Sequence, residues 1–375
     1  MKYRLTCLTP VIVGDGYRLS PIDYMVWKDQ INILDQHRIF RLLAKGPRLE
    51  GYLTQLKKAQ KLEFASWGGF AQNFADRRVP FEDPSLTRIW ERAATESLHI
   101  PTFAASTGGP YLPGSAIKGA LRSGLFFSQL KDAAVDSLSQ RMQAERPPRH
   151  PGAALEDETL GNGGGSRMRA LAASDSAPID RAAFQIHLLR VATLVQARNQ
   201  QGYSLGWKLS GRGSVDGAKV DESTPWFAEM ARPGTVFEGT WLEREYRKGR
   251  GAAGRGRVFE AANQYASRML AAHHEYAATT GMGKLGAGIE ELQTRLSGLS
   301  TDSACMLCIG WGGGFLSKTP WLGREQGSMS GILRALPYYS RAMQSGMPFP
   351  KTRRVVFEKN QPASLPGWAL LEIVA

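Results

Sequence analysis

Hydrophobic and polar residues alternate in several short segments of the chain. Residues 3–8 alternate up to Thr9-Pro10, and residues 184–188 alternate again, so both are predicted to be strands. Two apolar segments at 24–27 and 31–34 are separated by three polar residues, which predicts a short hairpin. Further strands are expected at 235–241, 304–309, 355–357 and 369–374.

Other segments carry apolar residues at the spacing of a helix. Ile117, Leu121, Gly124 and Leu125 would form one buried stripe of a helix that Ser115 caps at its N-terminus. A second helix is predicted around residues 258–270. Asp35 is expected to cap a third helix, and residues from about 46 to 100 look largely helical and separate from the first strands. We interpret that last segment as a helical insertion.

Strands and helices are mixed without strict alternation, so a doubly wound parallel sheet is disfavoured. An α+β fold with ferredoxin-like units fits the pattern better. The chain has 375 residues, which predicts two regions at about 100–200 residues each or one domain with large insertions. We place the regions at 1–230, with the insertion inside it, and at 231–375.

The charge of the chain points to a polyanionic partner. Lys and Arg number 47 and Asp and Glu 34, so the net charge is +13, which favours nucleic acid or an acidic surface. Three cysteines cannot build a disulfide framework, which fits a reducing cytoplasm. The sequence shows neither a signal-peptide core nor an apolar run of about 18 residues, so no membrane partner is expected.

Two segments could bind a phosphate. In the first, Ser115 opens a helix on which Lys118 and Arg122 are i, i+4 neighbours, and a helix N-terminus attracts anions. In the second, Gly312, Gly313 and Gly314 follow an apolar strand, where successive N–H groups can form an anion nest that Ser317 and Lys318 would extend. Trp311 or Phe315 could stack on a base. The alternatives are an ordinary capped helix with two solvated cations, and a flexible loop whose aromatic rings fill the core.

Several other segments resemble binding or catalytic motifs only weakly, and we assign most of them structural roles. The basic run 244–257 is more typical of a solvated loop than of a phosphate-binding segment. Residues 281–286 match G-x-G-x-x-G, but a helix precedes them, so a dinucleotide site is rejected. Cys305 and Cys308 lie in an apolar strand and are assigned to the core, so we predict no metal site and no cofactor. No catalytic constellation appears, and His37 is the one histidine to consider as a general base.

Taken in order, these motifs resemble the RAMP superfamily of CRISPR effector complexes. The matching segments are 8–16, 20–24, 111–122, 173–176, 233–238 and 310–319. Within the superfamily, the length and the long N-terminal segment are most similar to the family of fifth Csm subunits of type III-A systems. The resemblance implies a ferredoxin-like, RRM-like core with helical insertions and a C-terminal Gly-rich loop.

The resemblance also implies a function. It suggests a crRNA-binding subunit at the end of the stacked backbone subunits, on the 3′ side of the crRNA and linked to crRNA maturation. Ser115, Lys118 and Arg122 would lie near the RNA backbone, and residues 312–314 would form the family's Gly-rich loop. The implied partners are crRNA, the other Csm subunits (especially the backbone RAMP subunit), target RNA near the end of the complex, and host nucleases that trim the crRNA.

Two alternatives stay open from the sequence. One is a metal-independent RAMP endoribonuclease with His37 as general base, although no partner Tyr or Lys can be identified for it. The other is a RAMP subunit of a type III-B complex. The segment 46–100 is too large for a simple loop, and we expect it to dock on a homologous RAMP subunit.

Overall fold

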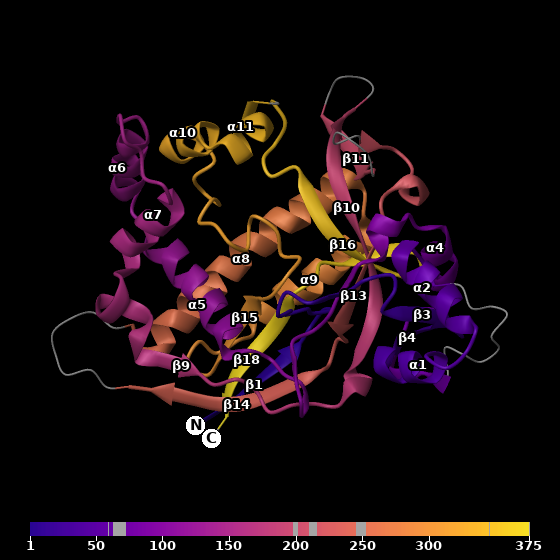
Figure 1. The fold of residues 1–375 in the computed structure, drawn as a ribbon. Coiled ribbons are helices and arrows are strands. Elements are labelled where there is room, and N and C mark those ends of the chain that lie inside the picture. Colours follow the sequence, from indigo (N-terminus) through magenta and orange to yellow (C-terminus); the bar gives the residue numbers. More distant parts are fainter. Residues whose placement is uncertain are drawn as a thin grey trace.

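The computed structural model describes residues 1–58, 60–62, 73–197, 202–209, 216–244, 253–344 and 346–374. It is a mixed α+β structure in which two antiparallel sheets form the body and helices cover them (Figure 1). None of the helices in these described ranges is long and apolar enough to cross a membrane.

The first sheet is built around the N-terminal strand. β1 (Lys2–Cys7) lies between β18 (Trp368–Val374) and β14 (Val236–Glu243), and the full order is β15-β18-β1-β14-β9. The outer strands are β15 (Ala304–Cys308) and β9 (Leu171–Ala173). All four pairings are antiparallel, and the two chain ends therefore lie side by side (Figure 1).

Two long helices pack against each other beside this sheet. They are α5 (Gly114–Gln129), which follows β1, and α8 (Arg255–Thr280), which follows β14. The helices approach so closely at Gly124 that a Cβ there would lie 2.7 Å from Ala262 Cα. Ile117, Leu121, Gly124 and Leu125 of α5 are all buried, which confirms the predicted stripe.

The second sheet is organised by the long strand β10 (Phe184–Gln196). Along one edge it pairs first with β13 (Trp226–Ala231) and then with β11 (Tyr203–Lys208), and along the other with β16 (Thr352–Glu358). β12 (Asp216–Gly217) and β17 (Gln361–Ser364) complete the order β12-β11-β10-β16-β17. Both sheets take strands from both sides of residue 230.

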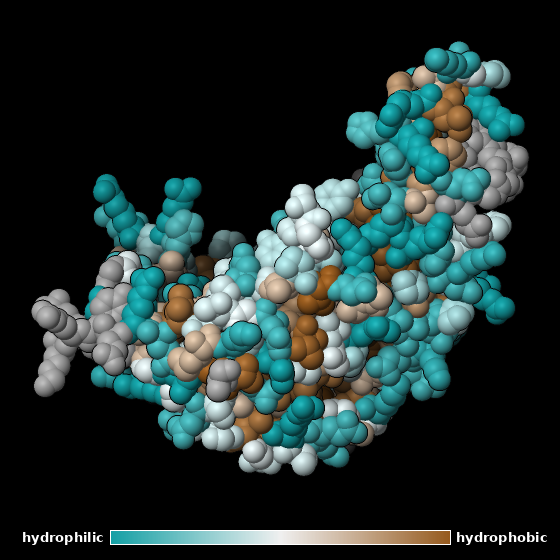
Figure 2. Space-filling view, turned by 90° about the horizontal axis from the view of Figure 1, so that it is seen from below, coloured by the Kyte–Doolittle hydropathy of each residue, from teal (hydrophilic) through white to brown (hydrophobic). Residues whose placement is uncertain are grey.

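A smaller unit projects from the body as a lobe in Figure 2. It contains the strands β3 (Tyr24–Trp27), β4 (Gln30–Leu34) and β5 (Ala75–Pro80) with the helices α1 (Gln36–Leu43) and α2 (Arg48–Lys58). It has its own small core of Leu34, Ile39, Leu43, Tyr52, Leu62 and Phe74. The predicted hairpin is confirmed, and its two turn residues, Lys28 and Asp29, have φ of 50° and 58°.

The expectation that residues 46–100 are separate from the first strands is wrong, although the segment does contain helices, α2 among them. β5 pairs with β4, so the segment completes a sheet that begins with the first hairpin. Beyond β5, the segment continues through α4 (Leu86–Arg92), whose Leu86 and Trp90 belong to the main core. Tyr24 ties the two parts together, because its hydroxyl donates to Leu98 O at 2.8 Å and accepts from Trp90 Nε1 at 3.0 Å.

Four helices that the sequence patterns did not predict surround one end of α5. They are α6 (Asp132–Met142), α7 (Pro151–Leu160), α10 (Ser328–Ala335) and α11 (Pro337–Gln344) (Figure 1). A fifth, α9 (Gly283–Ser297), packs on α8. The short elements are β2 (Arg18–Leu19), β6 (Ile100–Pro101), β7 (Ala105–Ser106), β8 (Gly109–Pro110), η2 (Thr95–Leu98), η3 (Gly163–Gly165), η4 (Arg167–Ala170), η5 (Arg181–Ala183) and η6 (Val220–Glu222).

Three local predictions are confirmed. Asp35 caps α1, because its side chain accepts from Arg38 N at 2.9 Å. A helix does precede residues 281–286, since α8 ends at Thr280 and Gly281 follows with φ of 67°. Cys305 and Cys308 are buried within β15.

Candidate nucleic-acid interface

The start of α5 is capped by a residue far away in the chain. Pro113 occupies the N-cap position and Ser115 lies inside the helix, so the prediction that Ser115 caps it is wrong. The amide of Gly114 donates instead to Asp175 Oδ1 at 2.8 Å. A Cβ on Gly114 would lie 2.2 Å from Ala173 O, so only glycine permits this close approach. The helix terminus therefore already holds one carboxylate of the protein itself.

The two cations of α5 differ in their surroundings. Arg122 is exposed, and its Nε lies 3.0 Å from Glu156 Oε1 of α7. An ion pair this exposed contributes little and exchanges readily for another anion. Lys118 is half-buried and forms no ion pair with any residue in the described ranges.

The glycine-rich loop follows β15 and has an alternating backbone. φ is positive at Gly310, Gly312 and Gly314, with values of 72°, 111° and 71°, and is not positive at the two residues between them. Such alternation turns successive N–H groups toward one side and is typical of an anion-binding nest. Within the described chain, the N–H groups of residues 312–314 donate to no backbone acceptor.

The loop also has packing reasons for its glycines. A Cβ on Gly310 would lie 2.0 Å from Ile12 O, and the neighbouring Trp311 N donates to that same oxygen at 2.9 Å. A Cβ on Gly312 would lie 2.6 Å from Pro366, and one on Gly313 would lie 2.5 Å from Ser317 Oγ. Close packing therefore requires glycine at three positions, whereas Gly314 faces open space.

The two aromatic residues of the loop differ in their surroundings. Phe315 is partly buried and packs against the core, where it meets Trp321, Tyr339 and Phe349 at centroid distances of 6.1, 5.4 and 4.8 Å. Trp311 instead lies under the guanidinium of Arg354, at 4.6 Å from its ring centroid. Tyr265 of α8 fixes the end of the loop, because its hydroxyl donates to Thr319 O at 2.9 Å.

The two predicted phosphate-binding segments meet in space. Ser115, Arg122 and Lys318 line one cavity of about 550 Å³. A neighbouring cavity of about 600 Å³ shares Phe315 and Tyr339 with the first and is lined by the glycines 312–314. Of the predicted site residues, Lys118 lines neither cavity.

The second cavity contains cations that the sequence analysis did not select. Arg353 and Arg354, near the start of the strand β16, line this cavity. Tyr338 of α11 and His273 of α8 line it as well. The signal available in the sequence is the pair of arginines directly before the apolar residues 355–357, since charged side chains next to a buried strand are rarely buried unless they are paired.

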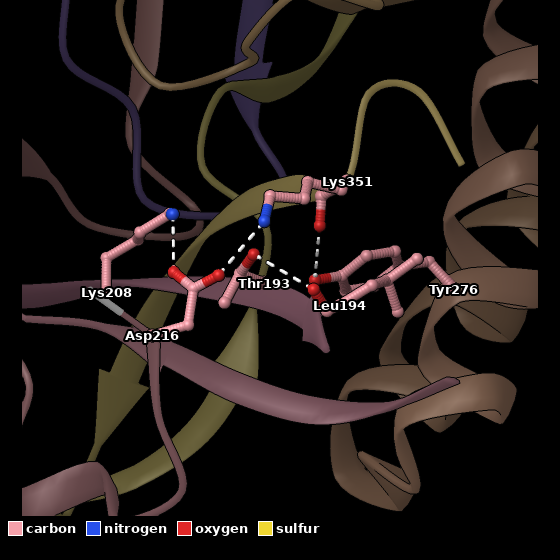
Figure 3. A network of polar contacts seen from close by, with 6 residues as sticks. All are labelled: Thr193, Leu194, Lys208, Asp216, Tyr276 and Lys351. Atoms are coloured by element: carbon pink, nitrogen blue, oxygen red, sulfur yellow. Dashed lines mark hydrogen bonds and ion pairs between the residues drawn. The ribbon is translucent and has the colours of Figure 1, made fainter. Parts of the chain in front are cut away.

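A polar network holds the start of β16 in place (Figure 3). Lys351 Nζ lies 2.9 Å from Asp216 Oδ2, and Lys208 binds the other carboxylate oxygen. Burial works against this carboxylate, but the hydrogen bonds from the two lysines lower the pKa of Asp216 below its ordinary value. The carbonyl of Lys351 accepts from Leu194 N at 2.9 Å and from the Tyr276 hydroxyl at 3.2 Å. Arg353 and Arg354 thus project from a fixed backbone.

The remaining candidates lie elsewhere. His37 is exposed on the first turn of α1, in the projecting lobe and away from both cavities. Most of the basic run 244–257 lies outside the described residues, and Arg255 within it pairs with Glu243 at 2.9 Å. Among the residues that the structure describes, no three or more His, Cys, Asp or Glu side chains gather as metal ligands would.

Comparisons with known proteins assign the family. A search of curated protein sequences finds no match. Among solved structures, the chain is similar to one from a "Cryo-EM structure of Csm-crRNA-target RNA ternary complex in type III-A CRISPR-Cas system", with a TM-score of 0.67, 19% identity, and coverage of 99% of this chain and 100% of that one. It is also similar to Csm5 of T. onnurineus, with a TM-score of 0.63, 15% identity, and coverage of 98% and 99%. Residues 4–317 match the family model of the RAMP superfamily, and the chain therefore belongs to that superfamily.

Proposed function

We propose that this chain is a crRNA-binding subunit of a type III-A CRISPR effector complex. It lies at the end of the stacked backbone subunits, on the 3′ side of the crRNA, and supports crRNA maturation as a scaffold. The observation that carries the proposal is the fold similarity over 99% of this chain and 100% of a chain from a Csm–crRNA–target RNA complex. The net charge of +13 supports a polyanionic partner.

The proposal includes a ferredoxin-like, RRM-like core, and the first sheet supports it. The four strands β18-β1-β14-β9 have the order 4-1-3-2 if β1 counts as the first strand and β9 as the second. α5 follows the first strand and α8 follows the third, as in a β-α-β-β-α-β unit. The glycine-rich loop leaves β15 at the edge of this sheet, which puts it next to α5.

Copurification tests the assembly. The chain is expressed together with the neighbouring CRISPR subunits and a repeat-containing RNA, and a tag on the backbone RAMP subunit is used for capture. The expected result is a complex that contains this chain and small RNAs of uniform length. Copurification with type III-B subunits instead, or release of the chain as a free monomer without RNA, would contradict the proposal.

Salt dependence tests whether phosphate contacts dominate the RNA binding. The logarithm of the binding constant should fall linearly with the logarithm of the salt concentration, with a slope of about −0.7 for each contacted phosphate of single-stranded RNA. A slope near zero would contradict an interface built from cations and backbone amides.

A double variant tests the face of α5. Lys118→Ala with Arg122→Ala should weaken retention of the guide RNA by roughly tenfold or more, because charge-assisted contacts contribute about 1.5–3 kcal/mol each and exposure lowers that value. Arg88→Ala with Arg92→Ala is the matched control, since these are exposed cations at the same i, i+4 spacing on α4. Equal RNA affinity in both double variants would contradict the prediction that this face of α5 contacts RNA.

A further inference from the structure

The cavity of about 600 Å³ beside the glycine-rich loop is electrostatically one-sided. Arg353 and Arg354 line it, and none of its described lining residues is an Asp or a Glu. Burial lowers the pKa of Arg353 to about 10, so its guanidinium is still charged at neutral pH. A cavity with two cations and no carboxylate is suited to an anionic ligand.

His273 adds a neutral donor to the same cavity. Its Nδ1 lies 3.0 Å from Arg353 Nε, and because a guanidinium can only donate, Nδ1 must accept and the ring proton must sit on Nε2. Burial and the Arg353 charge lower the pKa of His273 well below its ordinary value, so the ring stays neutral. A histidine held in this form donates a hydrogen bond, and its Nδ1 is not free to take up a proton.

The backbone supplies further donors. Residues 312–314 line the cavity, and their N–H groups donate to no backbone acceptor in the described chain. The alternating φ values of the loop are those of a nest. Arg354 lies over Trp311 at 4.6 Å, which places its charge next to this backbone.

An aromatic ring stands at the edge of the cavity. Tyr338 is 86% exposed, although it is a large side chain with an apolar ring. Its ring meets Tyr339 edge to face, at a centroid distance of 4.9 Å and an interplanar angle of 89°. Tyr339 is itself held by Phe315 and Phe349 at 5.4 and 6.0 Å. The exposed ring is therefore supported from behind, and proteins that bind single-stranded nucleic acid use such rings to stack bases.

We propose that this cavity binds one nucleotide of single-stranded RNA, with its phosphate on the amides of residues 312–314 and on Arg354, and its base stacked on Tyr338. The inference rests on the proposed function and adds a base-stacking residue, Tyr338, that no motif in the sequence indicated. The juxtaposition of a cationic, carboxylate-free cavity with a supported, exposed ring distinguishes a nucleotide from a simple phosphate ion, which would need no ring.

The test uses the full-length chain and a single-stranded RNA oligonucleotide in which one base is 2-aminopurine, with the label placed at successive positions. At one position the wild-type chain should quench the fluorescence, because stacking on Tyr338 brings the base against a ring. Tyr338→Ala should abolish that quenching and weaken binding roughly five- to hundredfold. Tyr338→Phe keeps the ring and should stay within about twofold of wild type.

Two controls separate stacking from charge and from folding. Tyr17→Ala removes a tyrosine that is 57% exposed elsewhere on the surface and should change neither readout. The salt slope should be unchanged in Tyr338→Ala, whereas Arg354→Ala should reduce its magnitude by about 0.7, the value for one lost phosphate contact.

The outcomes distinguish this inference from the proposed function. If wild type binds RNA with a steep salt slope but Tyr338→Ala binds equally well and no label position is quenched, the nucleotide site is refuted and the RNA-binding role stands. If Tyr338→Phe loses as much affinity as Tyr338→Ala, stacking is refuted in the same way. If wild type does not bind RNA at all, both are refuted.

Discussion

Gly310→Ala tests whether the glycine-rich loop is held by close packing against the chain that follows β1. A Cβ at Gly310 would lie 2.0 Å from Ile12 O and 2.9 Å from Ile12 C. Both atoms belong to the backbone, so no side chain can rotate away to make room. The loop would have to move, and the hydrogen bond from Trp311 N to Ile12 O, at 2.9 Å, would be lost with it.

The expected loss has three contributions. A residue other than glycine at φ of 72° costs about 1–2 kcal/mol. Overpacking adds about 1–3 kcal/mol, and the lost hydrogen bond adds about 1 kcal/mol. Gly314→Ala is the matched control, because its φ is 71° but a Cβ there would meet nothing within 4 Å. That variant should lose only the conformational contribution of about 1–2 kcal/mol.

The measurement is the free energy of unfolding from urea denaturation of both variants and wild type. Changes in the unfolded chain are the same for both Gly→Ala substitutions and cancel in the comparison. Gly310→Ala should be less stable than Gly314→Ala by about 2–4 kcal/mol. Equal stability of the two variants would refute the close approach of the loop to Ile12.

Three further perturbations are predicted. Ile117→Ala should cost about 2–5 kcal/mol in a thermal melt, because the Ile117 side chain on α5 is fully buried, and a loss below 1 kcal/mol would contradict that packing. Asp175→Ala removes the acceptor of Gly114 N and should cost about 0.5–2 kcal/mol in the same melt, whereas an unchanged melting temperature would mean that the cap contributes nothing. Burial lowers the pKa of His187 to about 4, so between that value and the ordinary 6.5 the unfolded chain binds a proton that the folded chain does not. Stability should therefore fall as the pH drops, with His187 contributing about 2 kcal/mol of the loss between pH 7 and pH 5. Urea denaturation at both pH values checks this, and His187→Gln should lose less on acidification than wild type.

Elements with a strong local pattern were predictable from the sequence. The alternation in β1, the turn at Lys28 and Asp29, the cap at Asp35 and the stripe through Ile117 all depend on residues within a few positions of one another. Periodicity and turn chemistry act at that range, so the sequence alone indicates them. The same holds for the glycine-rich loop, because a run of glycines indicates an unusual backbone conformation.

Only the tertiary structure decided how these elements combine. Three of the six residues of β5 are charged and its sequence has no clear alternation, and it is a strand because β4 offers it an edge to pair with. The cap of α5 is Asp175, which lies 61 residues after the amide it binds. Arg354 meets the loop at Trp311 from β16, and Lys351, just before that strand, is held by an ion pair with Asp216. Pairings at such sequence separations depend on how the two sheets pack, and no local pattern of residue types encodes that packing.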